Sequence, residues 1–193
     1  MGHSQAEKAQ SRERILSEAA TQIREAGLES VSVGKLMKRA NLTHGGFYGH
    51  FESRSDLLAK ALERALVDGE ATARASAEPG KRRSFAALVR SYLSRAHRDA
   101  PESGCAIAAL VSDVGRAEHE VRAVMTPHIE SYIELVAGEL GERDESAAIA
   151  AVSAMIGALA LSRVIVDPKR SDRILQAVRE HVLAMQEDAS AGA

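Results

Sequence analysis

The sequence predicts an all-α protein, and three observations agree on this fold class. Alanine, the strongest helix former, is abundant, and only four of the 193 residues are proline. Apolar residues recur three or four positions apart along most of the chain, which is the spacing of one helix face. No segment shows the strict alternation of apolar and polar residues that is typical of a half-buried strand. We therefore expect about nine helices.

Three short helices are expected in the N-terminal third, at residues 11–26, 32–40 and 43–50. Gly27 is a typical C-terminal stop for the first helix, and Ser32 is a good N-cap for the second. Asn41 should end the second helix, because asparagine tolerates the left-handed conformation that a tight turn needs. We assign residues 1–52 to one domain, a three-helix head.

Residues 53–193 are predicted to form a second helical domain. Ser53 and Asp56 have the spacing of an approximate capping box at the start of its first helix. Pro127 lies inside a later helix and should kink it, and Asp167-Pro168 should separate the last two helices. The expected helices cover residues 53–77, 85–93, 105–111, 116–140, 145–166 and 171–185.

Composition narrows the class of protein. The single cysteine, Cys105, excludes an internal disulfide and favours a reducing compartment. The polar N-terminus lacks the apolar core of a signal peptide, and the apolar stretch at residues 147–161 is too short for a membrane span. The histidines are scattered without metal-ligand spacing. We expect a cytoplasmic protein with no membrane association, no cofactor and no metal.

Residues 32–51 have the layout of a helix-turn-helix, in which the second of two short helices enters the major groove of DNA. Gly45 and Gly46 each lower the propensity of that second helix by about 1 kcal/mol, which favours a partner that approaches the backbone closely. The alternative is that these glycines mark a loop. Residues 1–55 carry a net charge of +2 and residues 56–193 a net charge of −4, which is weak support for a DNA-binding head.

The segment from Ser32 to Leu58 resembles the N-terminal signature of TetR-type transcriptional regulators. The most specific matches are the aromatic pair Phe47-Tyr48, the following His50-Phe51 and the basic residue after Ser53. The resemblance covers residues 11–58, and beyond them it extends only to the helical layout. The sequence departs from the commonest pattern at three positions, so the operator sequence does not follow from the family: Asn41, His44 and Gly46.

The resemblance implies a set of DNA-binding residues: Ser32, Thr43, His44, Gly45, Gly46, Tyr48, His50 and Arg54. Ser32 would cap its helix and meet a phosphate, while Thr43 and His44 would begin the recognition helix and reach base edges or phosphate. Tyr48 and His50 would contact phosphate or the groove wall. Arg54 would anchor a phosphate at the start of the next helix, aided by the positive end of that helix. The rings of Phe47 and Phe51 are instead expected in the core.

The resemblance also implies a body that binds a ligand and forms a dimer. Candidate ligand contacts are Tyr92, Cys105, Met125, His128, Tyr132 and Met155, although plain core packing is the alternative for each. Cys105 would be either a small buried hydrophobe or a thiol that senses electrophiles. The last two helices are expected to form a four-helix interface in a homodimer, because the Ala/Gly-rich residues 147–161 allow close helix approach.

We therefore expect a homodimeric repressor that binds a palindromic double-stranded DNA operator and is released by a small-molecule or electrophile inducer. No catalytic residue is assigned. Two other classes stay open. One is a helical enzyme with Cys105 as nucleophile and His97 or His119 as base, and the other is an interaction module whose head has lost DNA binding.

Overall fold

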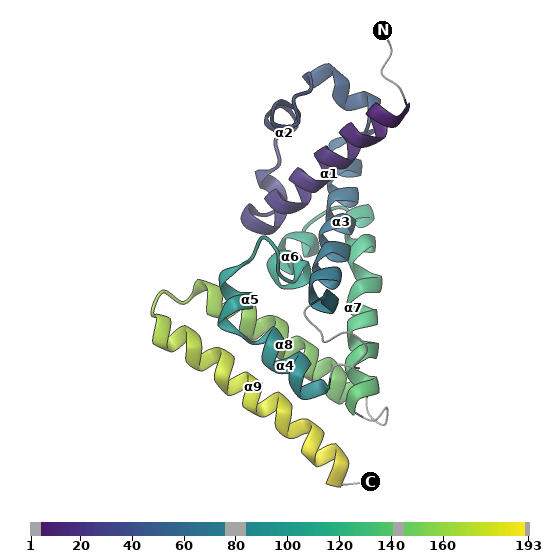
Figure 1. Ribbon diagram of the computed structural model, residues 1–193. Coiled ribbons are helices and arrows are strands. Elements are labelled where there is room, and N and C mark those ends of the chain that lie inside the picture. Colours follow the sequence, from purple (N-terminus) through teal and green to yellow (C-terminus); the bar gives the residue numbers. More distant parts are fainter. Residues whose placement is uncertain (1–4, 76–83, 141–144, 192–193) are drawn as a thin grey trace. The chain divides into compact units, whose positions relative to one another are not determined.

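The structure is a computed structural model that describes residues 5–75, 84–140 and 145–191 (Figure 1). Within these ranges the chain forms nine α-helices and two short 3-10 helices, η1 and η2, and no strand. The all-α prediction is confirmed. The elements are α1 (Gln5–Ala26), η1 (Leu28–Ser30), α2 (Val33–Arg39), η2 (His44–Gly49), α3 (Arg54–Ala75), α4 (Phe85–Tyr92), α5 (Arg95–Asp99), α6 (Ala106–Gly115), α7 (His119–Leu140), α8 (Glu145–Val164) and α9 (Pro168–Ala191).

The chain divides into two compact units that alternate along the sequence. The N-terminal unit comprises Met1–Ala71 and Cys105–Thr126, and the C-terminal unit comprises Thr72–Gly104 and Pro127–Ala193. The chain therefore leaves the first unit inside α3 and leaves it again inside α7, after contributing α6. These two units are defined by the packing of residues against one another. The functional boundary between residues 52 and 53 stays a prediction.

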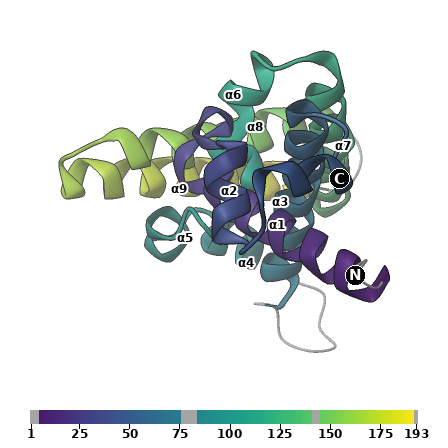
Figure 2. The same ribbon diagram turned by 90° about the horizontal axis from the view of Figure 1, so that it is seen from above.

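The N-terminal unit is built around α1, which packs against η1, α2 and α6 (Figures 1 and 2). Its buried face carries Ile15, Ala19 and Ile23, which recur at helical spacing as the sequence predicts. The guanidinium of the buried Arg24 donates to the Ala65 carbonyl oxygen at 3.3 Å, which ties α1 to α3. The helix-turn-helix elements are thus fixed to a continuous apolar core.

The C-terminal unit is built on α8 and α9, which lie side by side and run antiparallel because only residues 165–167 join them (Figure 1). α4 packs on both helices, and α5 packs on α8. The core between them contains Phe85, Val89, Met155, Leu175 and Val182. α8 buries one face rich in alanine, as close helix approach requires.

Two elements differ from the sequence-based expectation. Pro168 begins α9 instead of merely separating two helices, because proline suits the first helical position and Asp167 accepts a hydrogen bond from the Arg170 N–H at 2.9 Å. α5 lies in a stretch without a predicted helix of its own. It contains no buried residue, so it has no apolar stripe to reveal it, and Ser94 caps it by accepting from the His97 N–H at 3.1 Å.

Among the described helices, α8 is long and apolar enough to cross a membrane by length and composition alone. Core helices of soluble proteins pass the same test. One face of α8, including Ala151, Met155 and Leu159, is buried in the C-terminal unit, so packing within the protein accounts for the apolar residues on that face.

Candidate nucleic-acid interface

A tight turn joins α2 to η2 and sets their relative orientation. Asn41 adopts a positive φ of 57°, the only non-glycine residue to do so in the described chain. The Leu42 N–H donates to the Met37 carbonyl at 2.8 Å and the Asn41 N–H to the Lys38 carbonyl at 3.1 Å, which is the Schellman pattern of a helix end. The prediction that Asn41 ends this helix in a left-handed conformation is confirmed.

The second element of the motif, η2, is a 3-10 helix rather than the expected α-helix. It contains three glycines in six residues, and glycine is a poor helix former, so local propensity does not sustain a regular α-helix here. Its anchor is Phe47, which is buried and stacks on the buried Phe51 ring with centroids 5.6 Å apart. Both rings lie in the core, as predicted.

The outer face of η2 is open. Thr43, His44 and Gly45 are exposed, and the Tyr48 side chain is 72% exposed although it is an aromatic residue. A Cβ added at Gly45 or Gly49 would meet no atom within 4 Å, so the protein itself does not require glycine at these positions. Gly46 is half-buried, and a Cβ there would lie 3.6 Å from Thr43 Oγ1. An open glycine backbone flanked by exposed hydrogen-bonding side chains is a surface that a groove wall can approach closely.

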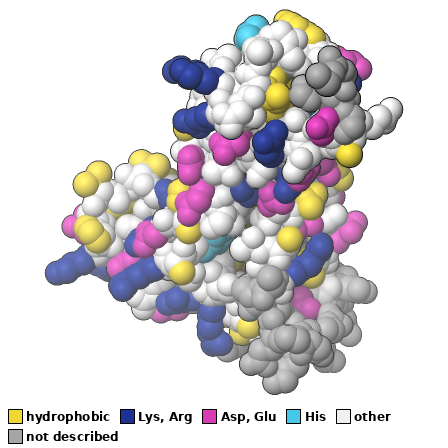
Figure 3. Space-filling view, turned by 45° about the horizontal axis from the view of Figure 1, so that its top comes forward, with side chains coloured by type: hydrophobic (Ala, Val, Ile, Leu, Met, Phe, Trp, Pro, Cys, Tyr) yellow, Lys and Arg dark blue, Asp and Glu magenta, His cyan; other side chains and the backbone are white. Residues whose placement is uncertain are grey.

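Positive charge lies beside this face. Lys35, Lys38 and Arg39 of α2 are exposed, and none forms an ion pair with the described residues. Figure 3 shows Lys and Arg side chains on the surface of the N-terminal part, with a histidine and hydrophobic side chains at its tip. Uncompensated cations next to an open recognition element are the usual electrostatic footprint of DNA binding.

His50 closes η2 and is half-buried. Its Nδ1 atom is buried and has no hydrogen-bond partner in the described part of the chain. Burial lowers the pKa of His50 below its ordinary value of 6.5, and the positive charges of Lys8 and Arg12 lower it further. The imidazole is therefore mostly neutral near pH 7.

Arg54 and Ser53 begin α3. Ser53 Oγ accepts from the Asp56 N–H at 3.0 Å, so the predicted cap by Ser53 is confirmed. The Asp56 carboxylate accepts from the Glu52 N–H at 3.1 Å, one residue before the N–H that a complete capping box would use. The Arg54 guanidinium donates to the Leu28 carbonyl at 3.2 Å, to the Val31 carbonyl at 3.3 Å and to the Glu29 carboxylate at 3.3 Å. Arg54 therefore holds η1, a role that the sequence did not indicate.

The two predicted caps behave differently from Ser53. Ser32 and Thr43 stand at the N-cap positions of α2 and η2 with extended backbone, but neither side chain makes a capping hydrogen bond. Both residues are exposed. The capping role expected of these side chains is not realised, which leaves their hydroxyl groups available to an external partner.

The six candidate ligand contacts fall into two groups. Tyr92, Tyr132 and Met155 come together in the C-terminal unit, where the two tyrosine rings lie 5.7 Å apart against the core that contains Met155. His128 is half-buried on α7. Cys105 and Met125 belong to the N-terminal unit, where Met125 is buried and Cys105, half-buried, precedes the first residue of α6.

His97, which the sequence offers only as a candidate base of the enzyme alternative, packs beside Tyr92. Its ring stands edge-on to Tyr92 with centroids 4.8 Å apart, and its Nδ1 lies 2.8 Å from the Tyr92 carbonyl oxygen. Burial lowers the pKa of His97, and the Arg163 charge lowers it further, against the effect of the Tyr92 carbonyl. His97 is a neutral, packed group rather than an exposed base.

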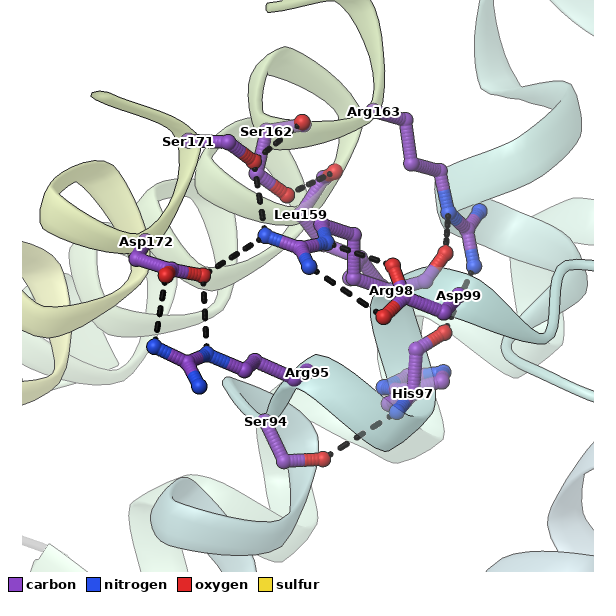
Figure 4. A network of polar contacts seen from close by, with 10 residues as sticks. All are labelled: Ser94, Arg95, His97, Arg98, Asp99, Leu159, Ser162, Arg163, Ser171 and Asp172. Atoms are coloured by element: carbon purple, nitrogen blue, oxygen red, sulfur yellow. Dashed lines mark hydrogen bonds and ion pairs between the residues drawn. The ribbon is translucent and has the colours of Figure 1, made fainter. Parts of the chain in front are cut away.

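A polar cluster fixes α5 to the α8–α9 turn (Figure 4). Arg98 donates to the Asp172 carboxylate at 2.8 Å and to Ser171 Oγ at 2.9 Å, and Ser171 donates to the Ser162 carbonyl at 2.6 Å. The Arg163 side chain of α8 donates to the backbone carbonyls of His97 and Arg98 in α5. α5 is therefore held through its backbone as well as through its side chains. Each of these bonds joins groups within the C-terminal unit, and the cluster has a structural role.

The N-terminal residues match a known family. Residues 15–61 match the family model of the bacterial regulatory proteins, tetR family. No curated protein sequence matches the chain. Within the described residues, no group of three or more His, Cys, Asp or Glu side chains is placed to hold a metal ion.

Solved structures of similar fold extend the match to nearly the whole chain. A TetR-family transcriptional regulator from Cytophaga hutchinsonii is 18% identical, with a TM-score of 0.77 over 95% of this chain and 98% of that chain. A TetR-family regulator from Streptomyces coelicolor is 22% identical, with a TM-score of 0.68 over 94% and 97%. The reduced form of E. coli NemR is 19% identical, with a TM-score of 0.68 over 90% and 95%.

A helix-turn-helix head on a helical body is the arrangement of DNA-binding transcription regulators, and the two comparisons support that class. Residues 15–61 match the tetR family of bacterial regulatory proteins, and the chain as a whole has the fold of TetR-family regulators. The resemblance inferred from the sequence is confirmed.

Proposed function

We propose that the protein is a homodimeric repressor that binds a palindromic operator through η2 and releases it when an inducer binds. The observation that carries DNA binding is the exposed face of η2 beside the uncompensated cations of α2. The cations would supply the affinity for backbone phosphate, and the exposed side chains of Thr43, His44 and Tyr48 would reach into the groove.

Arg54 has two roles in this proposal. Its Nε and Nη2 atoms hold η1, but Nη1 makes no hydrogen bond within the described residues, and 40% of the side chain is exposed. A guanidinium carries five N–H donors, so Nη1 can donate to a phosphate while the other nitrogens keep their partners. Because Arg54 would bond both η1 and the phosphate, the affinity of the head for DNA would then depend on the position of η1.

Dimer formation is supported by a second apolar face on α8. Opposite the buried face, Ile149, Leu161 and Val164 are exposed, with Val164 75% exposed, and the small residues Gly157 and Ala160 lie between them. Figure 3 shows hydrophobic side chains at the surface near the α8–α9 turn. A second copy packed on this face would bury it, and two-fold symmetry would place two η2 elements about 34 Å apart to match successive major grooves.

The inducer would bind in the helical body. Tyr92, Tyr132 and Met155 supply an aromatic and apolar surface in the C-terminal unit, which suits an apolar or aromatic small molecule. Cys105 supports the alternative of an electrophile, since a thiol forms a covalent bond with such an inducer. Either inducer would act by favouring a conformation whose two heads no longer fit the operator.

The decisive experiment is a mobility-shift titration with the duplex upstream of the protein's own gene. Stoichiometric, salt-sensitive binding is expected, and it would exclude catalysis by Cys105 as the main function. Tyr48→Ala should weaken binding, and Val67→Ala, an exposed position on α3, is the matched control. Equal binding by Tyr48→Ala and the wild type would contradict the assignment of η2. Complete labelling of Cys105 with an uncharged electrophile, without release of DNA, would contradict the electrophile alternative.

A further inference from the structure

The short helix α5 is attached to the C-terminal unit with almost no apolar contact. None of its residues is buried, and its only aliphatic side chain, Ala96, is exposed. The helices next to it in the fold, α4 and α8, instead bury apolar side chains such as Val89 and Met155. Apolar burial is the main stabilising term in folding, so α5 gains much less from it than its neighbours do.

Charged hydrogen bonds hold α5 in place (Figure 4). Arg95 donates to both carboxylate oxygens of Asp172, at 3.0 and 2.6 Å, and Arg98 donates to the same carboxylate at 2.8 Å. From α8, Arg163 donates to the carbonyl oxygens of His97 at 3.0 Å and of Arg98 at 3.1 Å. The Arg95 side chain is 72% exposed, so water and salt compete for its bonds. Asp172 is the one group that bonds both arginines of α5.

One side chain of α5 reaches the aromatic surface that we propose for the inducer. The His97 ring stands edge-on to the Tyr92 ring, and Tyr92 in turn lies beside Tyr132 with ring centroids 5.7 Å apart. The His97 ring is also in close contact with Gly104, where an added Cβ would lie 2.8 Å from His97 Cδ2. Movement of α5 away from α8 would therefore take the His97 ring off the edge of Tyr92.

The core of the C-terminal unit does not depend on α5. The buried residues that join α4, α8 and α9, including Phe85, Val89 and Leu175, come from other helices. Segments with few buried apolar contacts open locally at a smaller free energy than the whole domain needs to unfold. Opening of α5 would break bonds for which water competes and would leave this core packed.

We propose that α5 is a lid, which opens when its bonds to Asp172 break and then lets an aromatic small molecule reach Tyr92 and Tyr132. Aromatic rings pack on one another edge-on or offset, and His97 already holds the edge-on position against Tyr92. The ring of the ligand would take the place of the His97 ring. This proposal rests on the proposed inducer surface and adds a control on entry to it.

Tyrosine fluorescence can follow the opening, because the chain has three tyrosines and no tryptophan. In a Tyr48→Phe background only Tyr92 and Tyr132 emit. Asp172→Asn should then make this emission more easily quenched by acrylamide and should speed hydrogen exchange of the Arg98 amide about tenfold, since bonds to a charged acceptor become bonds to a neutral one. The dye 1-anilinonaphthalene-8-sulfonate, an aromatic probe, should bind with an on-rate that is also raised about tenfold.

Two further variants keep the test sharp. Arg95→Gln removes only the exposed part of the attachment, so it leaves the core intact and should give a smaller effect of about threefold. Glu180→Gln is the matched control, because Glu180 is an exposed carboxylate on the same helix as Asp172 that bonds Gln176. It should change neither the exchange nor the on-rate.

The outcomes separate the lid from the inducer surface. Unchanged exchange of α5 in both Asp172→Asn and Arg95→Gln would overturn the lid, and so would equal changes in Glu180→Gln. If the amides of α4 lose protection together with those of α5, the whole unit opens and the lid is wrong. If α5 opens more often but the dye binds the wild type just as fast, entry does not pass α5, and only the lid is overturned. If Tyr132→Leu leaves dye binding unchanged, or if no protein binds the dye, the aromatic surface and the lid are both overturned.

Discussion

Replacing Gly27 with alanine should destabilise the N-terminal unit by about 3.5 kcal/mol, from two terms of about 2 and 1.5 kcal/mol. Gly27 has φ 82° and ψ 169°, a region that only glycine populates readily, and an added Cβ would lie 2.5 Å from Asp113 Oδ2. The same oxygen accepts from the Leu28 N–H at 3.1 Å, so the methyl group would displace that carboxylate. Backbone strain costs about 2 kcal/mol. The lost bond costs about 1.5 kcal/mol, the lower end for a charged acceptor, because the Asp113 side chain is 33% exposed.

Urea unfolding of the full chain, followed by circular dichroism, measures this effect. Asp113→Ala alone should cost about 1.5 kcal/mol, and the double variant about 3.5 kcal/mol, since both changes remove the same bond. The control is Gly115→Ala, because a Cβ at that position meets nothing within 4 Å. A Gly27→Ala protein as stable as the wild type, or single effects that add fully in the double variant, would refute the reasoning.

Three further predictions concern other parts of the chain. Tyr48→Ala should weaken operator binding about tenfold by loss of a charged-group hydrogen bond, with no change in Tm, because the side chain is 72% exposed; a fall in Tm would place Tyr48 in the core. The pKa of His97 is lower in the folded protein than in the unfolded chain, so the unfolded chain takes up the proton first as the pH falls. The free energy of unfolding should therefore keep its full value above about pH 6.5 and decrease as the pH drops from there toward the folded pKa. Thermal melts at pH 7.5 and 5.5 should show this loss, and His97→Gln should show less of it. Leu161→Lys with Val164→Lys should give a monomer in sedimentation experiments, whereas Val67→Lys, on α3, should not; an unchanged mass would remove the α8 face from the interface.

Local sequence signals predicted the parts of the site that depend on single residues. Asn41 marks its turn because few other residues adopt a positive φ. The placement of Phe47 and Phe51 in the core follows from the resemblance to the TetR-type signature, in which both rings are local to the motif. Ser53 and Asp56 reveal a helix start through their spacing. Each of these signals lies within a few residues of the feature that it predicts.

The features that the sequence did not reveal depend on contacts between distant segments. Arg54 bonds to η1 more than twenty residues earlier, and Asp113 reaches Leu28 across 85 positions. The Arg98–Asp172 pair likewise joins α5 to α9 across 74 positions. No periodicity or spacing encodes such pairs in one sequence, so the roles of these charged residues emerge only once the helices are packed.

The interleaving of the two units has a consequence for how the protein can be made and dissected. α6 packs on α1 and η1, yet it is encoded after the whole first segment of the C-terminal unit. During synthesis the head cannot complete its packing before residues 105–126 have been made, which is when about two thirds of the chain has been translated. A fragment ending at Ala71 would leave the Leu28 N–H without Asp113 and expose the side of α1 that α6 covers. Domain-swap experiments on this protein should therefore carry α6 together with the helix-turn-helix.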